Sequence, residues 1–425
     1  MTGIQVAPTP GMAPRMAQKL EQAARIKEHS QERLRSLKTD IEAIRDAAFD
    51  AKADTRAFRF ARAVGEAEEG ALSPTERIVL HTPVGDMNIL QGAHEQFAFK
   101  LGIPWKYYLR LLAEYPDGLV EHGNHWLASE PATRLLRMMK PLTDEDRARL
   151  ARTDTVASIR AFLGEGYRPL DHAEVLSKAV EVAEETGAYL TQYSLSDKTF
   201  YLRLVSDPRP IAQIVRGMDH SPVAHEQLSF GVSIRNSETG HAALAIEEFE
   251  EVLICTNGMI GQDLLSVRHV GSKQGRKADG EGEDEGWLSR EAATLDDAAT
   301  FLKVRDAIRR GFTAERAEKG AQRFAKAAGH AIELPADVPL FTFVERVGKR
   351  YDLTQAETEI LKEEVTSDKW QRGGELTRLN LVQGVTATAR RTEDFERRVE
   401  LERLGWQLLD SPVERLAESV ARRTN

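Results

Sequence analysis

The hydrophobic positions near the start of the chain repeat at intervals of three and four residues. Residues 15–54 contain neither Gly nor Pro, and this spacing predicts one long amphipathic helix. Its apolar stripe contains Leu20, Ala23, Leu34, Leu37, Ile41, Ile44 and Ala48. Lys27 and Ser30 interrupt the stripe, which a coiled coil would want continuous. Two interpretations therefore stay open: packing against the protein's own body, or self-association through residues 15–54.

From residue 155 to 270 the apolar positions change to a period of two, which is typical of β-strands. Asp171 is a good N-cap and Gly187 a good stop for one helix within this region. Strands with a helix inserted, instead of regular βαβ alternation, predict an α+β fold with a mixed, mainly antiparallel sheet. The expected strands are 158–163, 188–193, 199–205, 230–234, 242–247 and 250–255, and loops are expected at 236–240 and 256–258.

These patterns divide the chain into five segments. We expect a disordered tail at 1–14, the amphipathic helix at 15–54, an α+β core domain at 71–270, a flexible charged linker at 271–286 and a helical region at 287–425. The tail is rich in Pro and Gly, and the linker is a basic run followed by an acidic one with several Gly.

Composition narrows the class of protein without naming an activity. The 425 residues include 58 Lys and Arg against 67 Asp and Glu, a net charge of −9, which argues against coating nucleic acid through overall charge. The single Cys255 excludes an intramolecular disulfide and fits a reducing cytoplasm. No run approaches the ~20 apolar residues of a membrane span, and no secretory signal is recognisable. We therefore expect a cytoplasmic protein without a membrane partner.

The most specific local pattern lies at residues 93–112 and has the spacing of a DNA-binding helix-turn-helix. Gly102 suits the turn, and Lys106, Tyr107 and Arg110 would then face DNA. A recognition helix usually carries short polar residues, whereas Trp105 and Tyr107 are bulky. A plain helical hairpin therefore stays open as the alternative.

A second basic segment covers residues 303–326. On a helix, its apolar residues bury one face and leave an outward positive face, which would attract phosphates in a salt-dependent manner. The candidate nucleic-acid-binding residues of this segment are Arg305, Arg309, Arg310 and Arg316. A solvated surface without a partner is the alternative.

Motifs for catalysis are mostly absent. The chain has no Gly-x-Ser-x-Gly elbow, no phosphate loop and no dinucleotide fingerprint. His220, His225, His241 and Cys255 are scattered without a compact ligand spacing, so we expect no metal and no cofactor. The acidic run 247–251 alternates around Phe249 and is expected to be a solvated strand face. These absences favour a binding protein over an enzyme.

Several segments together resemble a known family. Its most specific parts here are Asn236-Ser-Glu-Thr-Gly240 and Cys255-Thr-Asn-Gly258, supported by 160–171, the pair Arg268-His269, 384–390 and the pair Leu401-Glu402. Over residues 79–405 the chain resembles the phage/plasmid-like proteins defined by domain of unknown function 932. The resemblance implies a mobile-element setting, and it supplies no catalytic residues that can be carried over.

The residues behind the resemblance also have a direct interpretation. They suit turns, but exposed turn residues can bind ligands when a scaffold brings them together. The candidate polar site at one end of the sheet consists of Arg235, Asn236, Glu238, Asn257, Arg268 and His269.

Three hypotheses follow from the sequence. The leading one is a non-enzymatic mobile-element protein that binds DNA through Lys106, Arg110 and the basic helix around Arg309. The second is an oligomeric structural protein that assembles through residues 15–54, and the third is an enzyme with a cryptic polar site.

Overall fold

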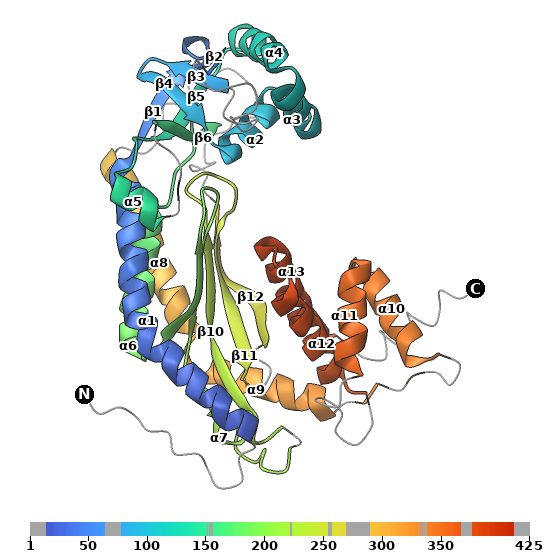
Figure 1. Ribbon diagram of the computed structural model, residues 1–425. Helices are drawn as coiled ribbons and strands as arrows, with labels where there is room; N and C mark the ends of the chain where they lie inside the picture. The colour runs from blue at the N-terminus through green and yellow to red at the C-terminus, as the bar shows by residue number, and fades with distance from the viewer. Residues whose placement is uncertain are drawn as a thin grey trace, which may run out of the picture.

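The α+β fold that the sequence predicts is confirmed by a computed structural model of the chain. Two six-stranded sheets, one in an N-terminal lobe and one at the centre of the molecule, organise the helices around them (Figure 1). The structure describes residues 14–63, 78–150, 152, 156–221, 223–253, 257–268, 290–329, 331–332, 334, 338–366 and 376–411. The expected linker at 271–286 and all but the last residue of the expected tail lie outside these ranges.

The N-terminal sheet has the strand order β1-β5-β6-β4-β3-β2. Its strands are β1 (Ala48–Asp54), β2 (Arg59–Arg62), β3 (Ile78–Thr82), β4 (Gly85–Ile89), β5 (Thr133–Met139) and β6 (Ser158–Gly164), with a short 3₁₀ helix η1 (Thr55–Ala57). Neighbouring strands pair antiparallel except β4 and β6, which run parallel with Asn88 opposite Ser158. The sheet is therefore mixed, as the sequence predicts.

Helices α2 (Gln91–Lys100), α3 (Trp105–Glu114) and α4 (Pro116–Ser129) pack on this sheet, and α5 (Asp144–Arg149) follows β5. The core between sheet and helices is rich in aromatic residues, including Phe60, Phe97, Tyr108 and Phe162. The rings of Phe97 and Phe162 stack with their centroids 4.1 Å apart, which joins α2 directly to β6.

The central sheet is antiparallel and has the order β12-β11-β10-β8-β7. Its strands are β7 (Tyr189–Leu195), β8 (Phe200–Val205), β10 (Gln227–Asn236), β11 (Leu244–Val252) and β12 (Asn257–Val267), and the short β9 (Arg209–Pro210) pairs with β10 ahead of helix α7 (Ile211–Ile214). Successive side chains alternate between the faces. In β8, Leu202 and Leu204 join the core of one face, while Tyr201 and Arg203 point to the other.

Helices cover both faces of the central sheet (Figure 1). One face packs against α6 (His172–Thr186), α8 (Arg290–Arg310) and the middle of α1 (Pro14–Ala47). The other face packs against α13 (Phe395–Asp410), with Tyr201, Phe249 and Val399 in contact. The expected bounds of α6 are present: Asp171 occupies the N-cap position, although its side chain makes no capping hydrogen bond, and Gly187 ends the helix with a φ of 71°.

The C-terminal helices form a second core next to the sheet. They are α9 (Ala314–Gly329), α10 (Leu340–Arg350), α11 (Gln355–Val365) and α12 (Arg378–Arg391), followed by α13. Phe324, Phe343, Leu361 and Leu381 meet in their shared core. Capping boxes fix the starts of α11 and α12, at Thr354 and Thr377 respectively, because each threonine side chain and the third helical residue exchange hydrogen bonds with the backbone.

The N-terminal helix differs from its expected extent. It ends at Ala47 instead of residue 54, because the alternating segment that follows pairs with β5 as strand β1. The N-terminal lobe therefore begins before residue 71, where the core domain was expected to start. Residues 244–252, which were expected to belong to two separate strands, form the single strand β11, and residues 257–258 lie in β12 instead of a turn.

The apolar stripe of α1 is buried inside the molecule. Leu34, Leu37 and Ile41 join the core under the central sheet. The two residues that interrupt the stripe make polar contacts with the same region: the Ser30 hydroxyl accepts a hydrogen bond from the Leu190 amide (2.8 Å), and Lys27 pairs with Asp207 (2.6 Å). The stripe packs on the protein's own body, which is the first of the two interpretations that the sequence left open.

Candidate nucleic-acid interface and the predicted polar site

The corner between α2 and α3 has the helical arrangement that the sequence predicts. Gly102 takes the left-handed conformation with a φ of 66°, and the Ile103 amide donates a hydrogen bond to the Ala98 carbonyl (2.9 Å). Tyr108 is buried, and its hydroxyl lies 2.8 Å from Nδ1 of His94. These contacts fix the angle between α2 and α3.

The opposite side of α3 faces solvent. Lys106, Tyr107 and Arg110 are all exposed. Nε of Arg110 lies 2.7 Å from Oε2 of Glu114, but both side chains are largely exposed, so the pair contributes little and a phosphate can compete with it. Within the described part of the chain, Lys106 forms no ion pair.

Several aromatic side chains of α2, α3, α4 and the junction between α3 and α4 are unusually exposed. The exposed fractions are 79% for Phe99, 48% for Tyr107, 56% for Tyr115 and 39% for Trp126. Nζ of Lys100 lies 5.6 Å from the ring centroid of Phe99, within cation–π distance. We call Phe99, Lys100, Lys106, Tyr107 and Arg110 the aromatic–basic face.

The basic residues of α8 are paired with carboxylates of α6. Arg305 lies 3.4 Å from Glu181, and Arg309 forms a bidentate pair with Glu185 (2.8 and 2.9 Å). Arg310 is exposed and forms no ion pair with any residue that the structure describes. The outward positive face predicted here is therefore largely neutralised by the neighbouring helix.

The acidic run 247–251 neutralises α9 in the same way. Arg316 pairs with Glu248, and Arg323 lies 2.7 Å from Glu250. Glu247, Glu248 and Glu250 are buried, so the expected solvated strand face is wrong. Burial raises the pKa of Glu250 even though Arg323 lowers it. The two charge runs that the sequence analysis assigned to solvent meet one another inside the fold.

The two predicted cationic segments do not share a surface. Helix α3 lies in the N-terminal lobe, whereas α8 and α9 lie along the central sheet (Figure 1). Lys106 and Arg110 are therefore separated from Arg305, Arg309, Arg310 and Arg316, and only the α3 segment keeps its cations outward next to aromatic rings.

The predicted loop at residues 236–240, which contains Asn236 and Glu238 of the predicted polar site, is a packed joint between the two sheets. The loop between β10 and β11 inserts against the N-terminal lobe, and both Asn236 and Glu238 are buried. The Gln96 side chain donates a hydrogen bond to the Thr239 carbonyl (2.5 Å), and the Tyr167 hydroxyl donates one to the Ser237 carbonyl (3.0 Å). The loop is held by contacts from the opposite lobe, instead of being an exposed turn.

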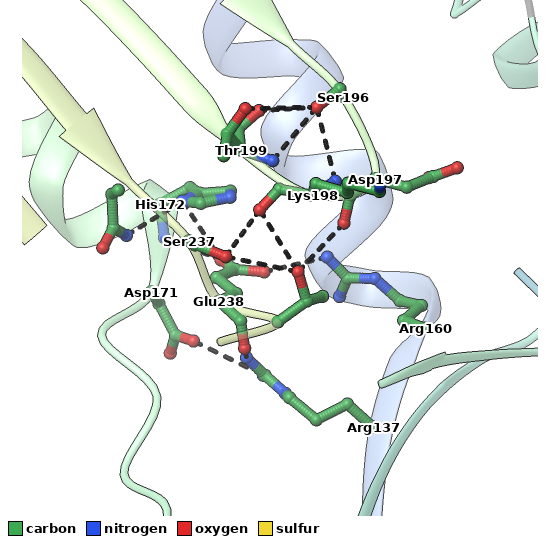
Figure 2. Close-up of polar contacts among 12 residues, drawn as sticks. Arg137, Arg160, Asp171, His172, Ser196, Asp197, Lys198, Thr199, Ser237 and Glu238 are labelled. Carbon is green, nitrogen blue, oxygen red and sulfur yellow. Dashed lines mark hydrogen bonds and ion pairs between the residues drawn. The ribbon is translucent and has the colours of Figure 1, made fainter. Parts of the chain in front are cut away.

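Glu238 is the centre of this joint (Figure 2). Its Oε2 accepts a hydrogen bond from Arg160 of β6 (3.0 Å), and its Oε1 accepts one from the His172 amide at the start of α6 (2.7 Å). Its carbonyl accepts a hydrogen bond from Arg137 of β5 (2.8 Å), which also pairs with Asp50 of β1 (3.0 Å). Glu238 therefore links three elements to the central sheet: its carboxylate contacts β6 and α6, and its carbonyl contacts β5.

The surroundings of Glu238 keep it charged. Burial raises its pKa, but His172, Arg160 and Arg137 outweigh burial and lower the pKa to about 2. Nη1 of Arg160 and Oδ1 of Asn236 are buried without a hydrogen-bond partner among the described residues. The joint is thus stabilised mainly by the charges that converge on one carboxylate.

The other predicted members of the polar site lie elsewhere. Asn257 begins β12 opposite Val252, at the end of the sheet away from Asn236, because β10, β11 and β12 run antiparallel. Arg268 follows β12 and is exposed. Arg235 precedes Asn236 in β10 and so points to the opposite face of the sheet. His269 lies outside the described residues, so the structure joins only Asn236 and Glu238.

Sequence reasoning missed Arg137, Arg160 and His172, the residues that complete this joint. A signal for two of them exists, because Arg137 and Arg160 each lie within an apolar strand. A charged side chain in a buried strand requires a buried partner of opposite charge. The sequence pattern alone does not identify Glu238 as that partner.

Across the described ranges, no three His, Cys, Asp or Glu side chains come together in an arrangement that could hold a metal ion. Cys255 and His269 lie outside those ranges. None of the helices in the described part of the chain is both long and apolar enough to cross a membrane.

Comparison with known proteins provides no relative. No family model matches the chain, and no curated protein or solved structure matches it significantly.

Proposed function

We propose that this chain is a mobile-element protein that binds single-stranded nucleic acid through the aromatic–basic face of its N-terminal lobe. The observation that carries the proposal is the exposure of Phe99 and Lys100 at the end of α2 together with that of Lys106, Tyr107 and Arg110 on α3. Unpaired bases stack on exposed aromatic rings, and nearby cations hold the phosphates that connect them.

Single strands fit this face better than a DNA duplex does. Reading the major groove relies on side chains that hydrogen-bond to base edges, whereas α3 presents bulky Trp105 and Tyr107 near its start. Base stacking needs no defined hydrogen-bond pattern, so we expect weak sequence preference and strong dependence on salt.

Fluorescence anisotropy with a labelled single strand and a duplex tests the proposal. We expect the single strand to bind more tightly, and binding to weaken steeply between about 50 and about 200 mM salt. Lys106→Ala/Arg110→Ala should weaken binding about tenfold and reduce the salt dependence, since it removes two phosphate contacts. Tyr107→Ala should weaken binding by a similar factor through lost stacking.

Lys38→Ala/Lys349→Ala is the matched control, because it removes two exposed cations that lie outside the face. Lys38 pairs with Glu42 four residues along its helix, as Arg110 pairs with Glu114. It should bind like the wild type. Equal loss in this control, or no retention of either nucleic acid at low salt, would contradict the proposal.

A further inference from the structure

A polar cavity of about 270 Å³ lies between α1, the central sheet and the helices α12 and α13. It is separate from the aromatic–basic face and from the joint around Glu238. Tyr189, Thr191 and Arg203 of the sheet contribute to its lining, together with Lys19 of α1 and Arg390 and Arg398 from the C-terminal helices. The cavity is partly open to solvent.

The lining is positively charged. Four cations, Lys19, Arg203, Arg390 and Arg398, face two carboxylates, those of Glu251 and Glu402. The cations exceed the carboxylates by two, in a protein whose overall charge is −9. A cavity with this excess attracts an anion, and its partial enclosure strengthens the attraction.

Arg203 is the most deeply buried of these cations. Its side chain is only 9% exposed, it lies 2.5 Å from Oε2 of Glu402, and its guanidinium lies over the Phe249 ring at 3.9 Å. Burial lowers the pKa of Arg203, but Glu402, Tyr201 and Glu251 together outweigh burial and raise it above its ordinary value, so Arg203 stays charged. Nη2 of Arg203 donates to Glu402 and to the Tyr201 hydroxyl, and these two acceptors do not use all of the donors of the guanidinium.

Three buried polar atoms of the lining have no hydrogen-bond partner among the described residues: Nε of Arg203, Nε of Arg398 and Oγ1 of Thr191. Buried polar groups are normally hydrogen-bonded, so a group of three around one cavity indicates a missing partner. Each of the three can donate a hydrogen bond, and a guanidinium donates best to an oxyanion.

We infer that this cavity binds a small molecule carrying a phosphate or carboxylate group. The volume is small for a ligand site, which excludes a polymer lying across it and favours a compact metabolite. The first turns of α1 form one wall, and a small apolar cluster of Met16, Ala23 and Leu253 helps to hold them there. A bound anion that contacts Lys19 should therefore also fix this part of α1.

Isothermal titration calorimetry of the full-length protein tests the inference with inorganic phosphate, a nucleoside monophosphate and citrate. Binding of either phosphate compound without citrate assigns a phosphate ligand, and the reverse assigns a carboxylate ligand. Absence of binding by all three up to about 10 mM overturns the inference.

Two variants locate the site. Thr191→Val keeps the shape of the side chain and removes an unpartnered hydroxyl, so the unliganded variant should be at least as stable as the wild type. Its affinity for the anion should fall about tenfold. Arg390→Gln, at an exposed lining position, should weaken binding by a similar factor. Arg25→Gln, an exposed α1 position that does not line the cavity, is the control and should bind normally.

Thermal denaturation with and without the ligand supplies the second readout. A ligand that binds only the folded state raises the denaturation temperature, and the shift grows with the logarithm of its affinity. Thr191→Val should therefore reduce this shift without lowering the unliganded value. Unchanged affinity in both Thr191→Val and Arg390→Gln would overturn the assignment of the site.

Discussion

Replacing Glu238 by Gln is expected to destabilise the protein by about 3–5 kcal/mol, the usual cost of removing one partner from a buried ion pair. The substitution keeps the shape of the side chain and removes the charge that Arg160 and the His172 amide contact. Arg160 would then be a buried cation without its carboxylate. Urea denaturation followed by tryptophan fluorescence measures the loss.

The same carboxylate predicts a dependence of stability on pH. Its pKa is about 2 in the folded protein and 4.5 as the ordinary value, so the unfolded chain takes up the proton first as pH falls. The stabilisation, about 3 kcal/mol for such a difference, is complete above the unfolded pKa and is lost as pH falls from about 5 towards 2. The stability difference between the wild type and Glu238→Gln should shrink over that interval.

Glu165→Gln is the control for Glu238, because Glu165 lies in an exposed turn close to β6. It should change stability by less than about 0.5 kcal/mol. Hydrogen exchange adds a local readout: amides of β6 and β10, on the two sides of the joint, should exchange faster in Glu238→Gln. Equal stability of the two variants would show that Glu238 does not hold the joint.

Local patterns in the sequence predict most of the secondary structure. The alternation in residues 158–163 and 199–205 corresponds to β6 and β8, and the caps Asp171 and Gly187 bound α6. Such signals are local, because a cap or an alternating pattern acts within a few residues. Strand β1 was missed because its Ala-rich sequence continues a helical pattern, and only pairing with β5 selects the extended form.

The charge runs show where local reasoning ends. Residues 247–251 and the arginines of α9 each suggest a solvated surface when considered alone. In the fold, Arg323 of α9 lies beside Glu250 of β11, although 73 residues separate them in the sequence. Pattern along the chain does not specify which distant element a charge will face, so both runs were misassigned.

The candidate polar site was predicted in part for a similar reason. Asn236 and Glu238 belong to one loop, so their proximity follows directly from the sequence. Placing Asn257 beside them required knowing which end of the sheet each hairpin occupies, and the antiparallel order of β10, β11 and β12 puts it at the opposite end. Arg137 and Arg160 arrive from the other lobe, which no local pattern indicates.

Breaking the Arg203–Glu402 pair is the second substitution with a large expected effect. Glu402→Gln should cost about 3–5 kcal/mol, because it leaves the buried Arg203 without its carboxylate and loosens α13 from β8. Urea denaturation measures the loss. Glu400→Gln on the same helix is the control, because Glu400 is exposed and, among the described residues, pairs with Arg397 alone. Such an exposed pair should contribute at most about 1 kcal/mol.

The double variant Arg203→Met/Glu402→Leu distinguishes a loss of charge pairing from a loss of packing. Replacing both members of a buried pair by apolar side chains of similar size is often neutral, so this variant should recover most of the stability that Glu402→Gln loses. It should nevertheless fail to bind the small anion, because the buried cation of the cavity is gone. If the double variant is as unstable as Glu402→Gln, the pair holds α13 by shape instead of by charge. If it is stable and still binds the anion with wild-type affinity, Arg203 is not the group that recognises the ligand.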